Sequence, residues 1–254
     1  MPRVLIWDLP VRAFHLVFAG GIAAAACIAL LGDDDGPLFP HHAMIGLTVA
    51  VALLLRIAWG VAGSRHARFA SFAYGPRAVI RYMTDTLRGK GQRFAGHNPG
   101  AAHAAFAMYA LMLLLTVSGI TLALGNRDAK DAHEVFAYAM VAAIGAHLAG
   151  LALHTVTHRE FIAASMVTGR KEADASEAIK GPYPLVAAIF VAIVVTFAVA
   201  LWSSYDSAAA TARIPVIGVQ LALGEDGEGG GEGGGDEHEG RRRSRDHRRD
   251  RDDD

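Results

Sequence analysis

The chain has 254 residues, of which 52% are hydrophobic and only 19% are charged, and its formal net charge is −1. Soluble domains carry about 25% charged residues, and here the apolar residues gather in five blocks instead of being spread evenly. This distribution excludes a soluble single-core enzyme and a soluble nucleic-acid-binding protein, and the single cysteine, Cys27, excludes a disulfide scaffold.

Each of the five apolar blocks is long enough to cross a bilayer, which takes about 20 mostly apolar residues. In chain order, the predicted helices cover residues 11–31, 43–62, 104–124, 134–157 and 184–202. Continuous apolarity, rather than alternation, argues against the strands of an outer-membrane barrel. After residue 203 the sequence changes to Gly/Glu-rich and then Arg/Asp-rich segments, which bury too little apolar surface to fold. We therefore expect an all-α integral membrane protein with a disordered tail over residues 205–254.

The loop charges predict the orientation of the helices. The segment 60–103 holds six arginines and one lysine against one acid, Asp85, whereas the loop with Asp33, Asp34 and Asp35 has no basic residue. The positive-inside rule then places the amino terminus and the 60–103 segment in the cytoplasm. With five spans, the carboxyl-terminal tail lies on the opposite side of the membrane, outside the cytoplasm.

Histidines at membrane depth form two pairs. His133 and His147 lie 14 residues apart on the fourth predicted helix, so they share a face and stand about 21 Å apart along its axis. His42 begins the second helix at the level of His133, and His15 lies near the inner end of the first helix, where it can serve His147. Two facing imidazoles suit a bis-histidine haem iron in a bundle core, whereas zinc needs three or four converging ligands. No Cys-x-x-Cys-His motif is present, so the haems would be non-covalent, b-type groups.

Spacing alone leaves two ligand positions open. His41 adjoins His42 on the second helix, and only one of the two can face a given neighbour. His154 lies on the same helix face as His147, and by depth it matches His15 slightly better than His147 does. The spacing therefore does not decide between His147 and His154.

Arg56 is the one internal charge of the second predicted helix. It follows His42 by 14 residues and shares its face, about 21 Å deeper, at the level of the inner haem. It would either pair with a haem propionate or extend its guanidinium to the cytoplasmic surface.

Two competing functions remain at this point. Intramembrane histidines could serve a transporter or proton relay, but no acid lies well inside any predicted span. The second competing function is that of a membrane anchor subunit that binds no haem.

A series of motifs runs through residues 4–171. In chain order they are Trp7-Asp8-Leu9-Pro10-Val11-Arg12-Ala13-Phe14-His15, His42-x-x-x-Gly46, Arg56-x-x-Trp59-Gly60, Gly63-Ser64-Arg65-x-Ala67-Arg68-Phe69, Gly75-Pro76-Arg77, Gly96-His97-Asn98-Pro99, His133-Glu134 and Met166-x-Thr168-Gly169-Arg170-Lys171. In this order they resemble the bacterial cytochrome b561 and nickel–iron-hydrogenase cytochrome b family. The resemblance implies a di-haem four-helix core over residues 1–178, with a fifth transmembrane helix over 179–204 outside it.

The resemblance also implies the ligands and the function. It assigns His15 and His147 to the inner haem and His42 and His133 to the outer haem, and it leaves His97 as a loop residue. It implies an electron-transfer subunit that exchanges electrons between the quinone pool and a redox partner, such as a hydrogenase or a periplasmic c-type cytochrome. The expected partners are thus membrane lipid, quinone and this protein, with quinone a substrate if the subunit belongs to a quinone-linked oxidoreductase. No nucleic acid is expected. Because the family is bacterial, the resemblance also implies the inner membrane as the location, with the carboxyl-terminal tail in the periplasm.

Overall fold

The computed structural model describes residues 2–32, 36–90 and 92–224 of the chain. Five of its helices are long and apolar enough to cross a membrane, which confirms the five predicted spans. They are α1 (Leu9–Leu31), α2 (Phe39–Ala62), α4 (Pro99–Ala123), α5 (Ala129–His158) and α7 (Pro184–Ser203).

The first four of these helices begin two to five residues before the predicted positions. Asp8 and Asn98 are the N-caps of α1 and α4, and each side chain accepts a hydrogen bond from a backbone N–H of the first turn. Pro10, Pro40 and Pro99 lie in the first turns of α1, α2 and α4. Proline and Asx caps are favoured at helix starts, so a helix opens before its continuous apolar block does.

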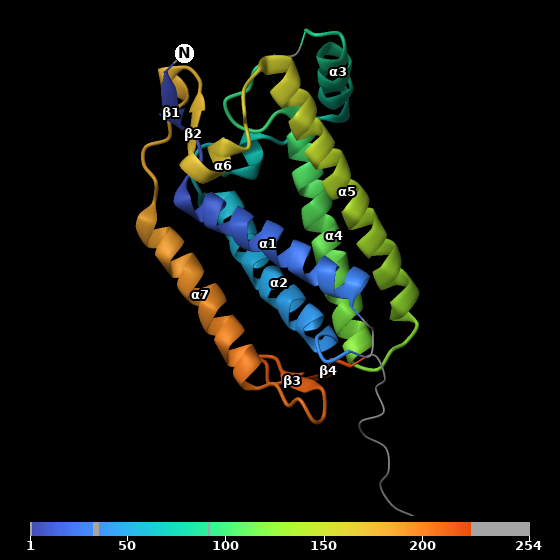
Figure 1. Cartoon of the computed structure of the whole chain (residues 1–254). Helices are drawn as coiled ribbons and strands as arrows, with labels where there is room; N and C mark the ends of the chain where they lie inside the picture. The colour runs from blue at the N-terminus through green and yellow to red at the C-terminus, as the bar shows by residue number, and fades with distance from the viewer. Residues whose placement is uncertain (1, 33–35, 91, 225–254) are drawn as a thin grey trace, which may run out of the picture.

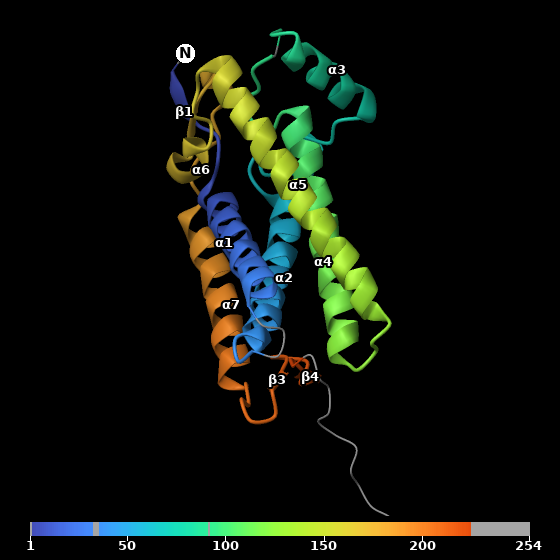
Figure 2. The same ribbon diagram turned by 45° about the vertical axis from the view of Figure 1, so that its right-hand side comes forward.

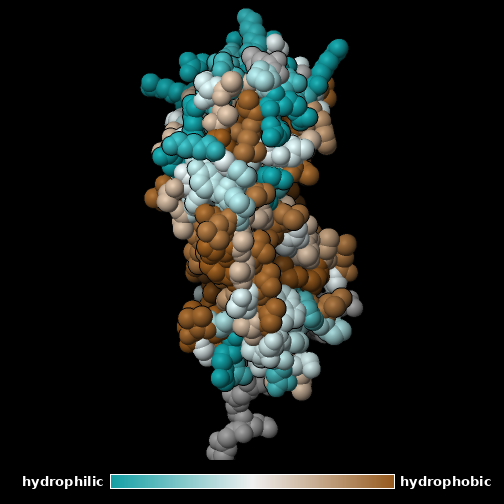
Figure 3. Space-filling model, turned by 90° about the vertical axis from the view of Figure 1, so that its left-hand side faces the viewer, coloured by the Kyte–Doolittle hydropathy of each residue, from teal (hydrophilic) through white to brown (hydrophobic). Residues whose placement is uncertain are grey.

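The spanning helices form two packed pairs. α1 packs along α2 and α4 packs along α5, with α2 in contact with α4, while α7 covers the outer side of α1 and α2 (Figures 1 and 2). Residues from all five helices meet in one apolar cluster: Phe14, Phe18, Val49, Leu53, Met112, Met140, Phe190 and Val194. Figure 3 shows a broad apolar band around the middle of the molecule, between two hydrophilic ends. This is the surface of a multi-pass membrane protein.

The hydrophilic end that holds the amino terminus contains short elements that the sequence did not predict. β1 (Arg3–Leu5) pairs antiparallel with β2 (Arg170–Glu172), although about 165 residues separate them. α3 (Pro76–Leu87), α6 (Ala164–Thr168) and two 3-10 turns, Phe69–Ser71 and Ala175–Glu177, complete this end. The segment between α2 and α4 is therefore partly folded, and the chain after α5 returns to the amino-terminal strand.

Residues 205–224, which we expected to be disordered, are folded in the structure. β3 (Thr211–Arg213) and β4 (Gln220–Ala222) form an antiparallel hairpin after α7. Its apolar side chains Ala212, Ile214, Leu221 and Leu223 pack with Met44 of α2 and Leu201 of α7. We expected disorder because the average composition of the tail is polar. Four apolar residues near its start are nevertheless sufficient to pack a hairpin against the bundle. The Gly/Glu-rich and Arg/Asp-rich segments, residues 225–254, lie outside the described residues.

Candidate functional site

The structure brings His42 of α2 and His133 of α5 next to each other, with their rings edge-on. Their ring centroids are 6.2 Å apart, and the ring planes are inclined by 73°. His42 Nδ1 lies 2.9 Å from the backbone carbonyl oxygen of Ala25 in α1. Because a carbonyl oxygen only accepts, Nδ1 carries the proton and donates it, which leaves a free lone pair on Nε2.

A serine fixes the second ring in the same tautomer. Ser118 Oγ of α4 lies 2.9 Å from His133 Nδ1 and donates its own proton to the carbonyl oxygen of Leu114, at 2.8 Å. The hydroxyl therefore accepts from His133 Nδ1–H, and Nε2 of His133 also keeps its lone pair. Gly119 leaves room for this ring, since a Cβ there would lie 3.2 Å from His133 Cε1.

The spacing of the two rings fits one metal ion between them. A metal–imidazole bond of about 2.0 Å on each side, added to the ring radii, gives a centroid separation of roughly 6 Å. The observed separation is 6.2 Å. Among the described residues, no three His, Cys, Asp or Glu side chains gather into a metal site. A two-imidazole site of this kind suits haem iron, whose other four ligands come from the porphyrin.

His41 and His42 point to different neighbours. The His41 ring packs against Trp202 at the end of α7, with centroids 6.4 Å apart, and against Tyr205, with centroids 5.9 Å apart. It thus belongs to the contact between α2 and α7, whereas His42 faces His133. The contact with α7 therefore distinguishes the role of His41 from that of His42, and the spacing arguments did not take this helix into account.

Nearer the amino-terminal end of the bundle, His15 of α1 and His147 of α5 lie within the range of an electrostatic interaction, and His147 lies within the same range of His97. The His15 side chain is exposed and that of His147 is half-buried. His154 is buried in a different environment, with Nε2 4.0 Å from a carboxylate oxygen of Glu160. The structure therefore places His15 and His147 in the same region of the bundle, whereas His154 lies beside the chain that follows α5.

Arg56 lies inside the protein, with only 1% of its surface exposed, so its guanidinium does not extend to the surface of the molecule. One nitrogen, Nη2, donates to the carbonyl oxygen of Ala67 at 3.0 Å. The guanidinium carbon lies 5.0 Å from the ring centroid of Phe69 and 5.9 Å from that of Tyr109. Nε and Nη1 are buried and have no acceptor among the described residues. A buried cation with two unused donors is costly, and a haem propionate is a carboxylate that would satisfy both.

The start of α1 is held by a buried carboxylate. Asp8 is fully buried; one oxygen accepts from the backbone N–H of Val11 at 2.9 Å, and the other accepts from Trp59 Nε1 at 3.0 Å. Asp8 thus caps α1 and ties it to the end of α2. His15 lies two turns further along α1, so this contact fixes the height of His15 against α2. The sequence motif contained Asp8 and Trp59, but only the fold shows that they are bonded.

His97 lies in the loop before α4, as expected, and is half-buried among aromatic rings. Its ring lies on Phe72, with centroids 4.2 Å apart, and edge-on to Trp7, with centroids 4.8 Å apart. Burial, together with the positive charges of Arg56 and Lys171, lowers the pKa of His97 to about 3. His97 is therefore neutral at physiological pH, and it adds polarity but no charge next to Arg56.

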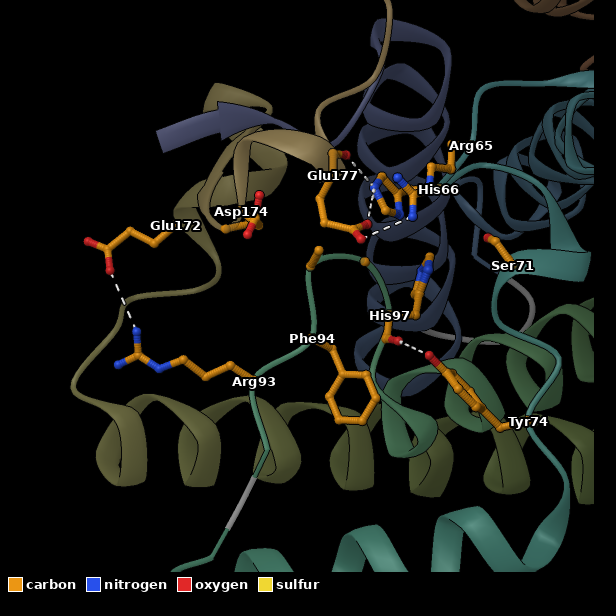
Figure 4. A pocket seen from close by; sticks show the side chains of 13 residues that line it. Arg65, His66, Ser71, Tyr74, Arg93, Phe94, His97, Glu172, Asp174 and Glu177 are labelled. Carbon is orange, nitrogen blue, oxygen red and sulfur yellow. Dashed lines mark hydrogen bonds and ion pairs between the residues drawn. The ribbon is translucent and has the colours of Figure 1, made fainter. Parts of the chain in front are cut away.

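A cavity of about 570 Å³ opens beside His97 at this hydrophilic end (Figure 4). Arg65 and His66 both contact Glu177 on one wall: Arg65 Nη2 lies 3.0 Å from a carboxylate oxygen, and His66 Nε2 lies 2.8 Å from the backbone carbonyl. On the other wall, the Tyr74 hydroxyl donates to the carbonyl oxygen of His97 at 3.1 Å. Arg93, Glu172 and Asp174 also line the cavity, so its lining is polar and carries charges of both signs.

The fold is that of a helical membrane protein whose spans carry histidines at two levels, with His42 and His133 adjacent at one of them. The family model for prokaryotic cytochrome b561 matches residues 6–169. This is well over half of the chain, and the chain belongs to the prokaryotic cytochrome b561 family. Membership implies haem b and electron transfer in a membrane. Comparison with curated proteins and with solved structures found no match to this chain. α7 and the β3–β4 hairpin lie outside the matched residues.

Proposed function

We propose that the protein is a two-haem electron carrier that exchanges electrons between the quinone pool and a redox partner protein, such as a hydrogenase or a periplasmic c-type cytochrome. His42 and His133 hold one haem b toward the outer end, and His15 and His147 hold the other toward the inner end. The single observation that carries this proposal is the His42–His133 pair, with its 6.2 Å separation and both Nδ1 atoms engaged elsewhere.

The residues around each pair serve the ligands and the charge of the bound groups. The Ala25 carbonyl and the Ser118 hydroxyl fix the tautomer and orientation of the outer imidazoles, which is how partners of metal-ligating histidines act. Arg56 binds a propionate at the inner end through its two unused donors. When bound, haem b supplies one-electron iron chemistry at a potential set by its ligands, its burial and nearby charge.

The same hydrogen bonds argue against a proton relay. A relay needs titratable groups that can pass a proton onward from one to the next. The Nδ1 proton of His42 ends on a backbone carbonyl, which cannot pass it on, and the Ser118 proton likewise ends on the carbonyl of Leu114. The outer histidines are therefore arranged to keep one tautomer rather than to exchange protons.

The experiment is a set of single histidine-to-alanine variants with neighbouring histidines as matched controls. Haem per chain is measured on each purified protein by the pyridine haemochrome assay, and the midpoint potential identifies the haem that remains. His42→Ala and His133→Ala should each lose the same haem, and His15→Ala and His147→Ala should both lose the other, because one axial imidazole alone holds haem poorly. His41→Ala and His154→Ala should keep both.

The pairing is refuted if the His15 and His147 variants lose different haems, or if His41→Ala loses a haem that His42→Ala keeps. A separate measurement tests electron exchange. A short-chain quinol added to the oxidised protein should reduce the haems, which is seen as the absorption spectrum of reduced haem b. Failure of several quinols to do so would refute electron exchange with quinone but would not affect the assignment of the haem ligands.

A further inference from the structure

α3 (Pro76–Leu87) is a short helix that belongs to none of the five spans. It connects two of them, α2 and α4, and lies at the hydrophilic end where α5 finishes (Figures 1 and 2). Its connections therefore keep it near the membrane surface on which those spans end. The pattern of its side chains differs around the helix axis, and each side indicates a different environment.

One side of α3 is packed against the start of α4. The Tyr82 ring contacts Phe94 edge-on, with centroids 5.7 Å apart, and Thr86 is buried. A Cβ added to Gly100, the second residue of α4, would lie 3.3 Å from the Tyr82 ring, so the helices approach closely here. This contact fixes the rotation of α3 about its own axis and determines which residues point outward.

The outward surface carries an apolar stripe. Ile80, Met83 and Leu87 are 65%, 44% and 73% exposed, and their spacing of three and then four residues places them on one line along the helix. No packed element of the described chain covers them. Large apolar residues that share one exposed face mark a surface that meets another molecule or a bilayer.

A basic stripe runs beside the apolar one. Arg77, Arg81 and Arg88 lie about 100° around the helix from it and are all exposed. Among the described residues, none of these three arginines forms an ion pair with a carboxylate. The whole segment 60–103 has seven basic residues and one acid, so the local field strongly favours an anionic surface.

We propose that α3 binds the surface of the bilayer, with Ile80, Met83 and Leu87 inserted among the upper acyl chains and the three arginines bound to the phosphates of anionic phospholipids. A helix with adjacent apolar and basic faces is the type that lies in a membrane interface, and basic residues near the surface attract anionic lipids. The bilayer is the occupant because the spans at both ends of α3 already lie in it. The contact between Tyr82 and Phe94 then holds the loop that carries His97 close to the anchored helix.

The test measures the depth of α3 by spin labelling of the whole protein in lipid vesicles. Cys27 is the only cysteine of the chain and is exposed, so Cys27→Ser supplies the background. One variant places the label on the apolar stripe, Ile80→Cys. The matched control, Asp85→Cys, places it about 140° away around the same helix. Collisions with oxygen, which partitions into the bilayer, are compared with collisions with a water-soluble nickel chelate.

In vesicles that contain phosphatidylglycerol, the oxygen-to-nickel collision ratio should be several-fold higher at position 80 than at position 85. Replacing the phosphatidylglycerol by phosphatidylcholine, or introducing Arg77→Gln and Arg81→Gln, should lower the ratio at position 80. All variants should keep the haem content of the parent protein, which shows that they fold. Equal ratios at 80 and 85 would overturn the proposal and leave the stripe to water or to another protein. A ratio insensitive to both lipid charge and the arginines would overturn the phosphate contacts.

Discussion

Replacing Arg56 by methionine separates a structural role of this residue from a role in haem binding. In the protein without haem, the change removes the bond to Ala67, about 2 kcal/mol for a charged donor, and the contacts with Phe69 and Tyr109, about 1 kcal/mol. It also removes two buried donors without acceptors, each of which costs about 1–3 kcal/mol. The net effect on the free energy of unfolding of the haem-free protein should therefore lie between about 1 kcal/mol of destabilisation and about 3 kcal/mol of stabilisation.

In the haem-loaded protein the same substitution leaves a buried propionate without its cation, which costs about 3 kcal/mol, or about a hundredfold in haem affinity. The assay is denaturant unfolding in detergent micelles, with and without haem, together with haem release at equilibrium. Arg56→Lys is the control, because it keeps the charge and should lose less affinity. Equal destabilisation of the haem-free and haem-loaded proteins by Arg56→Met would refute a propionate contact and leave Arg56 a structural residue.

Three further outcomes are expected. A reporter fused after Lys90 should be active only in the cytoplasm and one fused after Gly235 only in the periplasm; the reverse pattern would contradict the orientation. Truncation after Gly224 should keep both haems, whereas truncation after Ser207 removes the hairpin that packs on α2 and should lower retention of the outer haem; equal haem content would contradict this role. His97 has a pKa of about 3 when folded and 6.5 in its ordinary state, so the unfolded chain takes up its proton first as the pH falls. The free energy of unfolding should therefore fall as the pH decreases from 6.5 to 3. In His97→Leu this dependence of the free energy of unfolding on pH should be weaker.

The spans were predictable because long apolar blocks follow directly from the thickness of a bilayer. Their first turns were not, because the starts depend on caps such as Asp8 and Asn98 rather than on apolarity. The pairing of β1 with β2 joins three-residue strands about 165 residues apart, and such short strands have no detectable period. α3 did have a readable pattern, with Ile80, Met83 and Leu87 on one line, but its arginines were counted only as loop charges.

The candidate site was predictable to the level of a helix face but not to the level of a side chain. The 14-residue spacing placed His133 and His147 on one face; in the structure His133 lies next to His42, and His147 lies within electrostatic range of His15. Spacing could not separate His42 from His41, since the difference arises from α7 and its contact with His41. The hydrogen bonds that fix the outer rings come from Ala25 and Ser118, on helices whose rotation is set by packing.

The central claim is that one chain holds two haem b groups between its helices. The most direct measurement is haem per chain on the purified full-length protein, by pyridine haemochrome absorbance against amino-acid analysis, followed by a redox titration. Two haems per chain, titrating as two components, are predicted, because the proposed ligands His133 and His147 lie about four turns apart on α5, so the two haems would have different surroundings. One haem per chain in fully loaded protein, or none, would contradict the account.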